Sequence, residues 1–274
     1  MEIAYGPEAL HKFDFHAAPG SVRPAPLIVF VHGGAWRSED KSQHADLARS
    51  LARLSGFPVA VPNYRLTTPR TPLQHPAHAS DVLRFLHFLT TWSGPAAEDP
   101  PPTRLYLLGH SCSAHILASI LLTSPFPELT PSPSLLLAVR AVVVSEGIYD
   151  VDALLRSFPA YREWFIADTF GDHAAYPDVN VASYPVQPGG EHIRWLVLHS
   201  SGDVLVDQLQ SDIMYAHLSS MAITSDVPAT TASPRPKVSK NFDELSEDHN
   251  ELLAGVVYPR IVADFVTVDA AAPL

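Results

Sequence analysis

The sequence has few of the features that mark a secreted or membrane-embedded protein. Only one of its 274 residues is a cysteine, Cys112, so no intrachain disulfide can form. The first ten residues, MEIAYGPEAL, have neither the basic segment nor the apolar core of a secretory signal. The apolar runs have the length of buried strands, well short of the roughly 20 residues that cross a bilayer. We therefore expect a cytoplasmic protein that does not enter a membrane.

Clustered positive charge is also missing. The chain has 18 lysines and arginines against 29 acidic residues, a formal net charge of -11. No run of basic residues could follow a phosphate backbone, which excludes a nucleic-acid surface and an anionic-membrane surface. The 14 histidines are scattered, and no His/Cys/Asp cluster has zinc spacing, so we expect no metal and no cofactor. The expected partner is a small-molecule substrate. The oligomeric state is left open, and a homodimer is one option.

Short apolar segments alternate with segments of helical periodicity. The strand candidates are 26–31, 57–61, 105–108, 141–144 and 195–199, and the helix candidates between them are 42–54, 77–91 and 114–123. Strands that are apolar on both faces are typical of a parallel sheet covered by helices on each side. This alternation predicts one doubly wound α/β domain over residues 1–274.

Some segments interrupt this pattern. Residues 93–102 and 125–134 are rich in proline and are predicted to be surface loops. The polar stretch 222–240 predicts a flexible insertion loop. Residues 150–188 carry many aromatic side chains, and we interpret them as a small helical cap over the site. These aromatic residues are Phe158, Tyr161, Trp164, Phe165, Phe170, Tyr176 and Tyr184.

The strongest chemical signal follows the predicted strand at 105–108. There Gly109-His-Ser111-Cys-Ser113 joins the strand to a helix, as in a nucleophile elbow, whose tight turn strains the serine backbone. Ser113 replaces the second glycine of the usual Gly-x-Ser-x-Gly pattern but is small enough to fit. The sequence therefore predicts Ser111 as a nucleophile. The thiol of Cys112 is expected to be buried and inert.

A second glycine-containing motif, His32-Gly33-Gly34-Ala35-Trp36, follows the strand at 26–31. Paired glycines let backbone N–H groups face a cavity, although a plain glycine turn would look the same. Its position one strand-helix unit before the elbow favours an oxyanion hole. We expect the N–H groups around Gly33 and Gly34, with that of Cys112, to form it.

An acid and a base occur later in the chain. Asp203 lies closer than Asp207 to the end of the strand at 195–199, which favours it as the acid. His249 precedes a C-terminal helix, whereas His217, the other histidine after Asp203, lies within a helical run. Ser111, Asp203 and His249 thus occur in the chain order of an α/β-hydrolase triad. The expected fold is accordingly an α/β-hydrolase, with a mostly parallel central sheet, helices on both faces and a small helical cap.

Four segments of the chain resemble kynurenine formamidases, also called arylformamidases, of the fungal type. They are the His32–Trp36 loop with Asp40 and Lys41 after it, Gly109–His115, Glu146-Gly-Ile-Tyr-Asp150, and His249-Asn-Glu251. The resemblance spans most of the chain except the proline-rich loops and 222–240. It implies cleavage of N-formyl-L-kynurenine to L-kynurenine and formate, in tryptophan catabolism and NAD biosynthesis.

The same resemblance implies an aromatic pocket for the substrate. Trp36 and Tyr149 are its first candidates, and Phe158, Tyr161 and Trp164 are further ones, with core or lid packing as the alternative. Arg65, Arg156 and Arg162 are candidate partners for the substrate carboxylate, and the sequence does not distinguish them.

Three other functions are weighed against this one. A carboxylesterase of the hormone-sensitive-lipase type shares the loop and the triad, although it usually has a third glycine where this chain has Ala35. An inactive hydrolase fold that serves as a binding protein would usually lack one member of the triad. A peptidase would normally need a larger lid or an extra domain.

Overall fold

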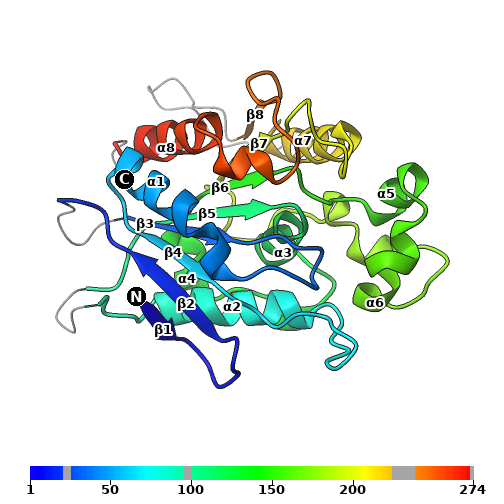
Figure 1. Cartoon of the computed structure of the whole chain (residues 1–274), viewed down its shortest axis with the longest axis horizontal. Helices are drawn as coiled ribbons and strands as arrows, with labels where there is room; N and C mark the ends of the chain where they lie inside the picture. Colours follow the sequence, from blue (N-terminus) through cyan, green and yellow to red (C-terminus); the bar gives the residue numbers. More distant parts are fainter. Residues whose placement is uncertain (21–25, 96–99, 224–237, 272–274) are drawn as a thin grey trace.

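A single mixed sheet forms the centre of the computed structural model, which describes residues 1–20, 26–95, 100–223 and 238–271 (Figure 1). Its strand order is β1-β2-β4-β3-β5-β6-β7-β8. The strands are β1 (Glu2–Ala4), β2 (Lys12–His16), β3 (Leu27–Val31), β4 (Val59–Pro62), β5 (Leu105–His110), β6 (Val139–Ser145), β7 (Arg194–Leu198) and β8 (Val238–Asn241). The pairings from β4 to β8 are parallel, and β1 and β2 add an antiparallel edge.

Helices cover both faces of the sheet because its strands are apolar on both sides. Along β3, Ile28 and Phe30 pack in one core with α1 (Ala45–Ser55) and α8 (Val257–Ala270). The alternate residues face a second core under α2 (Ala77–Leu89), α3 (Cys112–Leu121) and α7 (Gln208–Ile223). Figure 1 shows α1 and α8 on one side of the sheet and α2 on the other. Among the described residues, no helix is both long and apolar enough to cross a membrane.

The register of the parallel strands brings several chain segments to one edge of the sheet. Gly109 of β5 pairs with Val31 of β3 and with Val144 of β6, and Ser145 pairs with Leu198 of β7. These four strands therefore end at the same level. The segments that follow them emerge side by side, where ligands bind in open α/β sheets.

Residues 150–188 lie beyond this same edge as short helical pieces (Figure 1). They include α5 (Val151–Ser157), a π-helical turn at Arg162–Ile166, and α6 (Ala167–Phe170). A further short helix, α4 (Pro133–Ala138), leads into β6. The edge of the sheet and the helical pieces beyond it thus enclose the region where the predicted site residues emerge.

The predicted fold class is confirmed, and the five predicted strands and three predicted helices correspond to β3–β7 and α1–α3. Sequence reasoning did not identify β1, β2 or β8. The loop predicted over 222–240 lies mostly outside the described residues. It is wrong at both ends, because residues 222–223 belong to α7 and residues 238–240 to β8.

Candidate active site

The turn between β5 and α3 holds Ser111 in a strained conformation. Its φ of 57° and ψ of -126° lie in a region that a residue with a Cβ rarely adopts. The Ser111 N–H donates to the carbonyl oxygen of Ser145 at 2.9 Å, which fixes the turn against the end of β6. Helix α3 begins at Cys112, so its first N–H groups lack intrahelical acceptors and point toward the turn. This is the geometry of a nucleophile elbow.

Ser113, which stands where a second glycine is usual, is fully buried, and its hydroxyl binds three backbone groups. The Ser113 Oγ lies 2.6 Å from the carbonyl oxygen of Val31 and 2.8 Å from that of His110. It also accepts the N–H of His110 at 2.8 Å. The serine therefore joins the elbow to the end of β3 instead of merely fitting in the space of a glycine.

The loop after β3 lies against the elbow in an unusual backbone conformation. Gly34 has a φ of 91°, and a Cβ on it would lie 2.3 Å from the carbonyl oxygen of Ser38. Ala35 and Trp36 follow with φ values of 51° and 58°. The Trp36 N–H donates to the Cys112 Sγ at 3.3 Å, which ties the loop to the first turn of α3.

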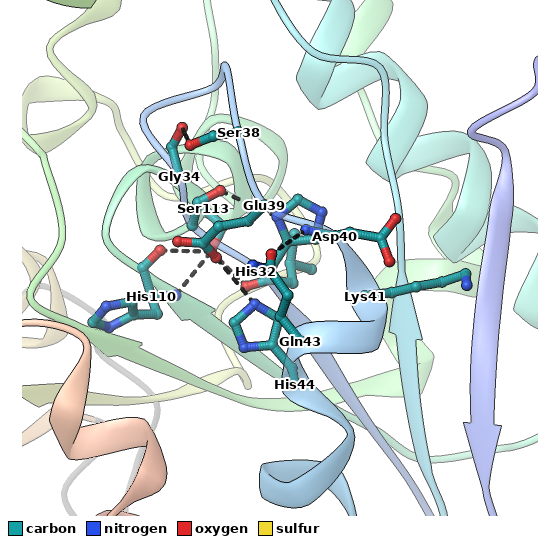
Figure 2. A network of polar contacts seen from close by, with 12 residues as sticks. His32, Gly34, Ser38, Glu39, Asp40, Lys41, Gln43, His44, His110 and Ser113 are labelled. Atoms are coloured by element: carbon teal, nitrogen blue, oxygen red, sulfur yellow. Dashed lines mark hydrogen bonds and ion pairs between the residues drawn. The ribbon is translucent and has the colours of Figure 1, made fainter.

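A network of polar side chains on and next to this loop holds it in place (Figure 2). The Ser38 hydroxyl donates back to the Gly34 carbonyl at 2.9 Å, and the Glu39 carboxylate lies 3.0 Å from His44 Nε2. Burial acts to raise the pKa of Glu39, but its hydrogen bond to His44 and the charges of His44, His32 and His249 together outweigh burial, and the pKa is lowered. Lys41 turns away from the site, toward Asp14 on β2 at 3.2 Å. The loop conformation is thus fixed by polar contacts of its own side chains with the backbone and with His44.

Backbone strain in the described residues is concentrated at this site. Five residues other than glycine have a positive φ there: Ala35, Trp36, Glu39, Ser111 and Glu146. All five belong to the glycine-containing loop, the elbow or the end of β6. Such conformations cost about 1–3 kcal/mol each and persist where the surrounding structure enforces them, most often at functional sites.

The predicted acid and base lie next to each other. The Asp203 Oδ2 is 2.7 Å from the His249 Nδ1, and both side chains are almost completely buried. The Asp203 Oδ1 accepts the N–H groups of Leu205 at 2.8 Å and Val206 at 3.0 Å, so the carboxylate is held from both sides. The competitor Asp207 instead accepts the hydroxyl of Ser157.

The loop that carries His249 packs closely on the turn that carries Asp203. A Cβ on Gly202 would lie 2.3 Å from the carbonyl oxygen of Ser246 and 2.7 Å from that of Glu247. The Ser200 hydroxyl donates to the same Glu247 carbonyl at 2.5 Å. Glycine at position 202 is therefore what lets the two loops bring the acid and the base together.

A second carboxylate, that of Glu146, also faces His249. Its side chain is fully buried at the end of β6, and its Oε2 lies 3.2 Å from the His249 Nδ1. Its Oε1 accepts the N–H of Ser200 at 3.2 Å. Sequence reasoning noted Glu146 only within the Glu-Gly-Ile-Tyr-Asp segment and assigned it no role. The available signal was a charged residue directly after an apolar strand.

Burial and charge shift the pKa values of this cluster. Burial raises the pKa of Glu146 to about 7, against the effect of its contact with His249, and the charge of Asp203 adds to the rise. Burial acts to lower the pKa of His249, but its contacts with Asp203 and Glu146 outweigh that effect and raise it to about 9. The imidazole thus lies in an environment that favours its protonated form.

One group of described side chains has the spacing of a metal site. His110, Glu146 and His249 are buried, and a ligand atom of each lies within 4.8 Å of the others. The His249 nitrogen that faces Glu146 is already held by Asp203 as a hydrogen-bond donor, so a metal at this point would have to displace its proton. We therefore assign the Glu146 carboxylate to the histidine.

A cavity of about 270 Å³ opens over Ser111 and His249. It lies just below the roughly 300–1,000 Å³ of typical ligand clefts, so it suits a small substrate. Tyr161, Trp164 and Phe165 from residues 150–188 form its aromatic side. The other lining residues are Gly34, Ala35, Arg37, Ser38, Glu39, Ile148, Leu205, Val206 and Asn250.

The structure places two predicted substrate-binding residues away from this cavity. Trp36 is fully buried and packs against His115, Phe165 and Phe170. Tyr149 is also fully buried, and the residue before it, Ile148, lines the cavity instead. Both aromatic residues support the site from within the core, because a left-handed backbone at Trp36 and the turn after Glu146 direct them inward.

The basic residues considered for the substrate carboxylate also lie elsewhere. Arg65 is paired with the buried Asp81 at 2.7 Å, and Arg162 lies 3.2 Å from Asp172. The residues that line the cavity do not include Arg65, Arg162 or Arg156. Arg37, which sequence reasoning did not consider, does line it. The Cys112 thiol is fully buried, and burial raises its pKa to about 12, as expected for an inert group.

Known proteins resemble the chain in sequence and in fold. A kynurenine formamidase of Eremothecium gossypii is 29% identical over 205 residues, which cover 72% of this chain and 80% of that protein. A kynurenine formamidase of Drosophila melanogaster is 32% identical over 157 residues, 56% of this chain and 46% of the relative. The chain thus spans about half of the fly protein. Esterase B of Lactobacillus rhamnosis superimposes with a TM-score of 0.70 at 15% identity, over 98% of this chain and 85% of that one.

The family model named BD-FAE matches residues 13–218, more than half of the chain. The match includes the glycine-containing loop, the elbow and Asp203, while His249 lies beyond it. The curated relatives are amide hydrolases, and the structural neighbour shares the α/β-hydrolase fold. The chain therefore belongs to the BD-FAE family of the α/β-hydrolase superfamily and is a hydrolase that acts on amides or esters.

Proposed function

We propose that the protein hydrolyses the formamide of N-formyl-L-kynurenine to L-kynurenine and formate, with Ser111, His249 and Asp203 as its triad. One observation carries the proposal: strained Ser111 and the Asp203-held His249 face the same small, aromatic-walled cavity. The similarity to kynurenine formamidases supports the choice of substrate. The single buried cysteine is compatible with a cytoplasmic location, which we include in the proposal.

In the first half-reaction, His249 Nε2 takes the hydroxyl proton of Ser111 as Oγ attacks the formyl carbon. The oxyanion is stabilised by the N–H of Cys112 and by N–H groups of the Gly33–Gly34 segment. His249 then returns the proton to the aniline nitrogen, the C–N bond breaks, and L-kynurenine leaves. Asp203 keeps Nδ1 protonated throughout, so that Nε2 can act as the base.

In the second half-reaction, water attacks the formyl ester on Ser111. His249 takes a proton from the water and returns it to Oγ, and formate leaves. A formyl group is the smallest acyl group, which fits the close approach of the glycine loop to the nucleophile: a Cβ on Gly33 would lie only 3.2 Å from that of Ser111.

The cavity offers complementary groups to the rest of the substrate. Tyr161, Trp164 and Phe165 provide an apolar wall for the aryl ketone, and we propose that residues 150–188 act as its cap. Among the described residues on the wall, Arg37 is the one lysine or arginine. Its guanidinium donates to the carbonyl oxygen of Trp164 and has further donors for a carboxylate. We therefore place the amino-acid end of the substrate at Arg37.

The test is a direct comparison of substrates. Purified protein is assayed on N-formyl-L-kynurenine and on p-nitrophenyl acetate, with Ser111→Ala as the variant. The proposal expects a higher kcat/KM for the formamide and loss of nearly all turnover in Ser111→Ala. A much higher kcat/KM for the ester would overturn the substrate, and near-normal activity of Ser111→Ala would overturn the nucleophile.

A carboxylesterase is the second candidate, and the rim of the cavity favours it. Leu205 lines the cavity and is 36% exposed, its neighbour Val204 is 71% exposed, and Trp164 is 46% exposed. These apolar side chains could take the acyl chain of an ester. A series of p-nitrophenyl esters separates the two functions, because a carboxylesterase would gain kcat/KM as the acyl chain grows from two to six carbons.

A further inference from the structure

Two buried carboxylates converge on the same nitrogen of His249. They come from the ends of neighbouring parallel strands, Glu146 directly after β6 and Asp203 in the turn after β7. The Nδ1 lies 2.7 Å from the Asp203 Oδ2 and 3.2 Å from the Glu146 Oε2. Both carboxylates have fully buried side chains. A triad needs only one acid, so the second carboxylate calls for an explanation.

Glu146 forms an ion pair with the histidine but no hydrogen bond to it. Its Oε1 accepts the Ser200 N–H, whereas its Oε2 accepts no hydrogen bond from the described residues. The Nδ1–H is directed at Asp203, which is closer. A small rotation of the imidazole would move that hydrogen toward the Glu146 Oε2. The Glu146 Oε2 is therefore a second possible acceptor for this hydrogen, 3.2 Å from the His249 Nδ1.

The backbone at Glu146 indicates that this placement is enforced. Its φ is 49°, which is costly for a residue with a Cβ. An unpaired ionised carboxylate is also expensive to bury, and the ion-pair partner of Glu146 among the described residues is the imidazole of His249. Strain and burial together are hard to explain for a residue that only fills space.

We propose that Glu146 is a second acid of the site, a positioning residue that shares the Nδ1–H of His249 with Asp203 and holds the imidazole when Asp203 is removed. This inference rests on the proposed triad and is independent of the proposed substrate. It assigns a function to the first residue of the Glu-Gly-Ile-Tyr-Asp segment.

Other titratable groups also face this pair. His110 at the end of β5 has its ring centroid 4.6 Å from that of His249, and burial keeps its pKa well below the usual value. The charges of Asp203, Glu146 and His249 also shift the pKa values of groups at longer range. These groups are His199 after β7, Glu39 of the glycine-containing loop, Tyr149, Tyr161 and Tyr258. Among the described groups, only Asp203 and Glu146 form ion pairs with His249.

The first experiment removes the acids one at a time and together. Loss of the acid typically costs a serine hydrolase about 10⁴-fold in kcat. If Glu146 takes over, Asp203→Ala should lose less than about 100-fold, and only Asp203→Ala with Glu146→Gln should approach about 10⁴-fold. The assay uses whichever substrate the wild-type protein cleaves. Circular dichroism and thermal unfolding confirm that each variant is folded.

The second experiment does not require the loss of Asp203, whose Oδ1 also orders the turn. The pH dependence of kcat/KM is measured for Glu146→Gln. His249 must be neutral to accept the serine proton, so activity rises with pH through its pKa, which is about 9. Glu146→Gln removes one negative charge next to His249 and should lower its pKa. The rise of kcat/KM with pH should therefore move to lower pH by about one unit or more.

Asp207→Asn is the matched control, because Asp207 lies in the same segment as Asp203 but contacts Ser157 instead of His249. Its pH profile should superimpose on that of the wild type. Two results would overturn the inference: Asp203→Ala as inactive as the double variant, or a Glu146→Gln profile identical to that of the wild type. If Ser111→Ala retained activity, the proposed triad itself would fail, which is a separate outcome.

Discussion

The hydroxyl oxygen of Ser113 lies 2.6 Å from the carbonyl oxygen of Val31 and so links the nucleophile elbow to the strand that precedes the glycine-containing loop. The same hydroxyl contacts the carbonyl oxygen of His110, so Ser111 lies between two residues, His110 and Ser113, that are joined to each other. The parts that would supply the nucleophile and the oxyanion donors are therefore held at a fixed separation by one buried side chain. A glycine at position 113 could not provide this contact.

Replacing Ser113 with alanine should destabilise the protein by about 1–3 kcal/mol, because the buried His110 N–H and the Val31 carbonyl would each lose a partner. Urea unfolding measures the change. Ser119→Ala is the control, since its hydroxyl on the same helix contacts only His115 at 3.3 Å among its described partners. Equal stabilities of Ser113→Ala and the wild-type protein would show that the hydroxyl contributes nothing.

The sequence was sufficient for those parts of the fold that depend on continuous apolar runs. Strands β3 to β7 are buried along almost their whole length and were predicted for that reason. The strand β2 alternates, with Phe13 and Phe15 inward, and β8 is a short polar edge strand. Neither forms an apolar run, and their pairing depends on neighbours distant in the sequence. Local patterns did not indicate them.

The residues of the site also divide into those that local sequence patterns predict and those whose roles depend on contacts distant in the sequence. Ser111 and the Gly33–Gly34 loop follow apolar strands within one or two residues, so their location could be predicted. The role of Glu146 could not be predicted, because it depends on β6 lying beside β7 and on the loop of His249, about 100 residues later in the chain, packing against both strands. Trp36 illustrates the opposite error: its motif suggested a cavity residue, but the left-handed backbone turns the ring into the core.

Gly202 provides a test of how closely the acid and base loops must pack. In Gly202→Ala, the new Cβ would meet the Ser246 carbonyl oxygen at 2.3 Å, so the loop that carries His249 must move. A displacement of about 1 Å can cost about 100-fold in rate, and kcat should fall by that order. Gly255→Ala, just after the loop that carries His249, is the control, because its nearest contacts at 3.2 Å require a shift of only a few tenths of an ångström. Equal kcat values for the two variants would contradict the packing argument.

Buried neutral histidines should make the protein sensitive to acid. Burial lowers the pKa values of His32, His78 and His115 to about 4, while in the unfolded chain they titrate near 6.5. The unfolded state therefore binds more protons as pH falls from about 6.5 to about 4, and stability is lost in that window. Each histidine contributes up to about 1.4 kcal/mol per pH unit. Urea unfolding at pH 7.5 and 5.5 measures the loss.

Two groups act in the opposite direction: Glu146, whose pKa is raised to about 7, does so between pH 7 and 4.5, and His249, whose pKa is raised to about 9, does so between pH 9 and 6.5. They are two groups against several histidines. His78→Gln should reduce the pH dependence of the unfolding free energy, since glutamine can still reach the Thr67 hydroxyl that His78 contacts at 2.9 Å. His173→Gln is the control, because that histidine is exposed. Stability independent of pH between 7.5 and 5.5 would contradict this account.

Arg37 tests the proposed substrate orientation. A charge-assisted contact with a carboxylate is worth about 1.5–3 kcal/mol, so Arg37→Gln should raise KM for N-formyl-L-kynurenine about 10- to 100-fold with little change in kcat. On 2-formamidoacetophenone, which keeps the formamide and the aryl ketone but lacks the amino-acid end, the variant and the wild type should behave alike. Arg162→Gln is the matched control, because Arg162 pairs with Asp172 outside the cavity. An equal rise of KM on both compounds would mean that Arg37 supports the cap through the Trp164 carbonyl and does not bind the carboxylate.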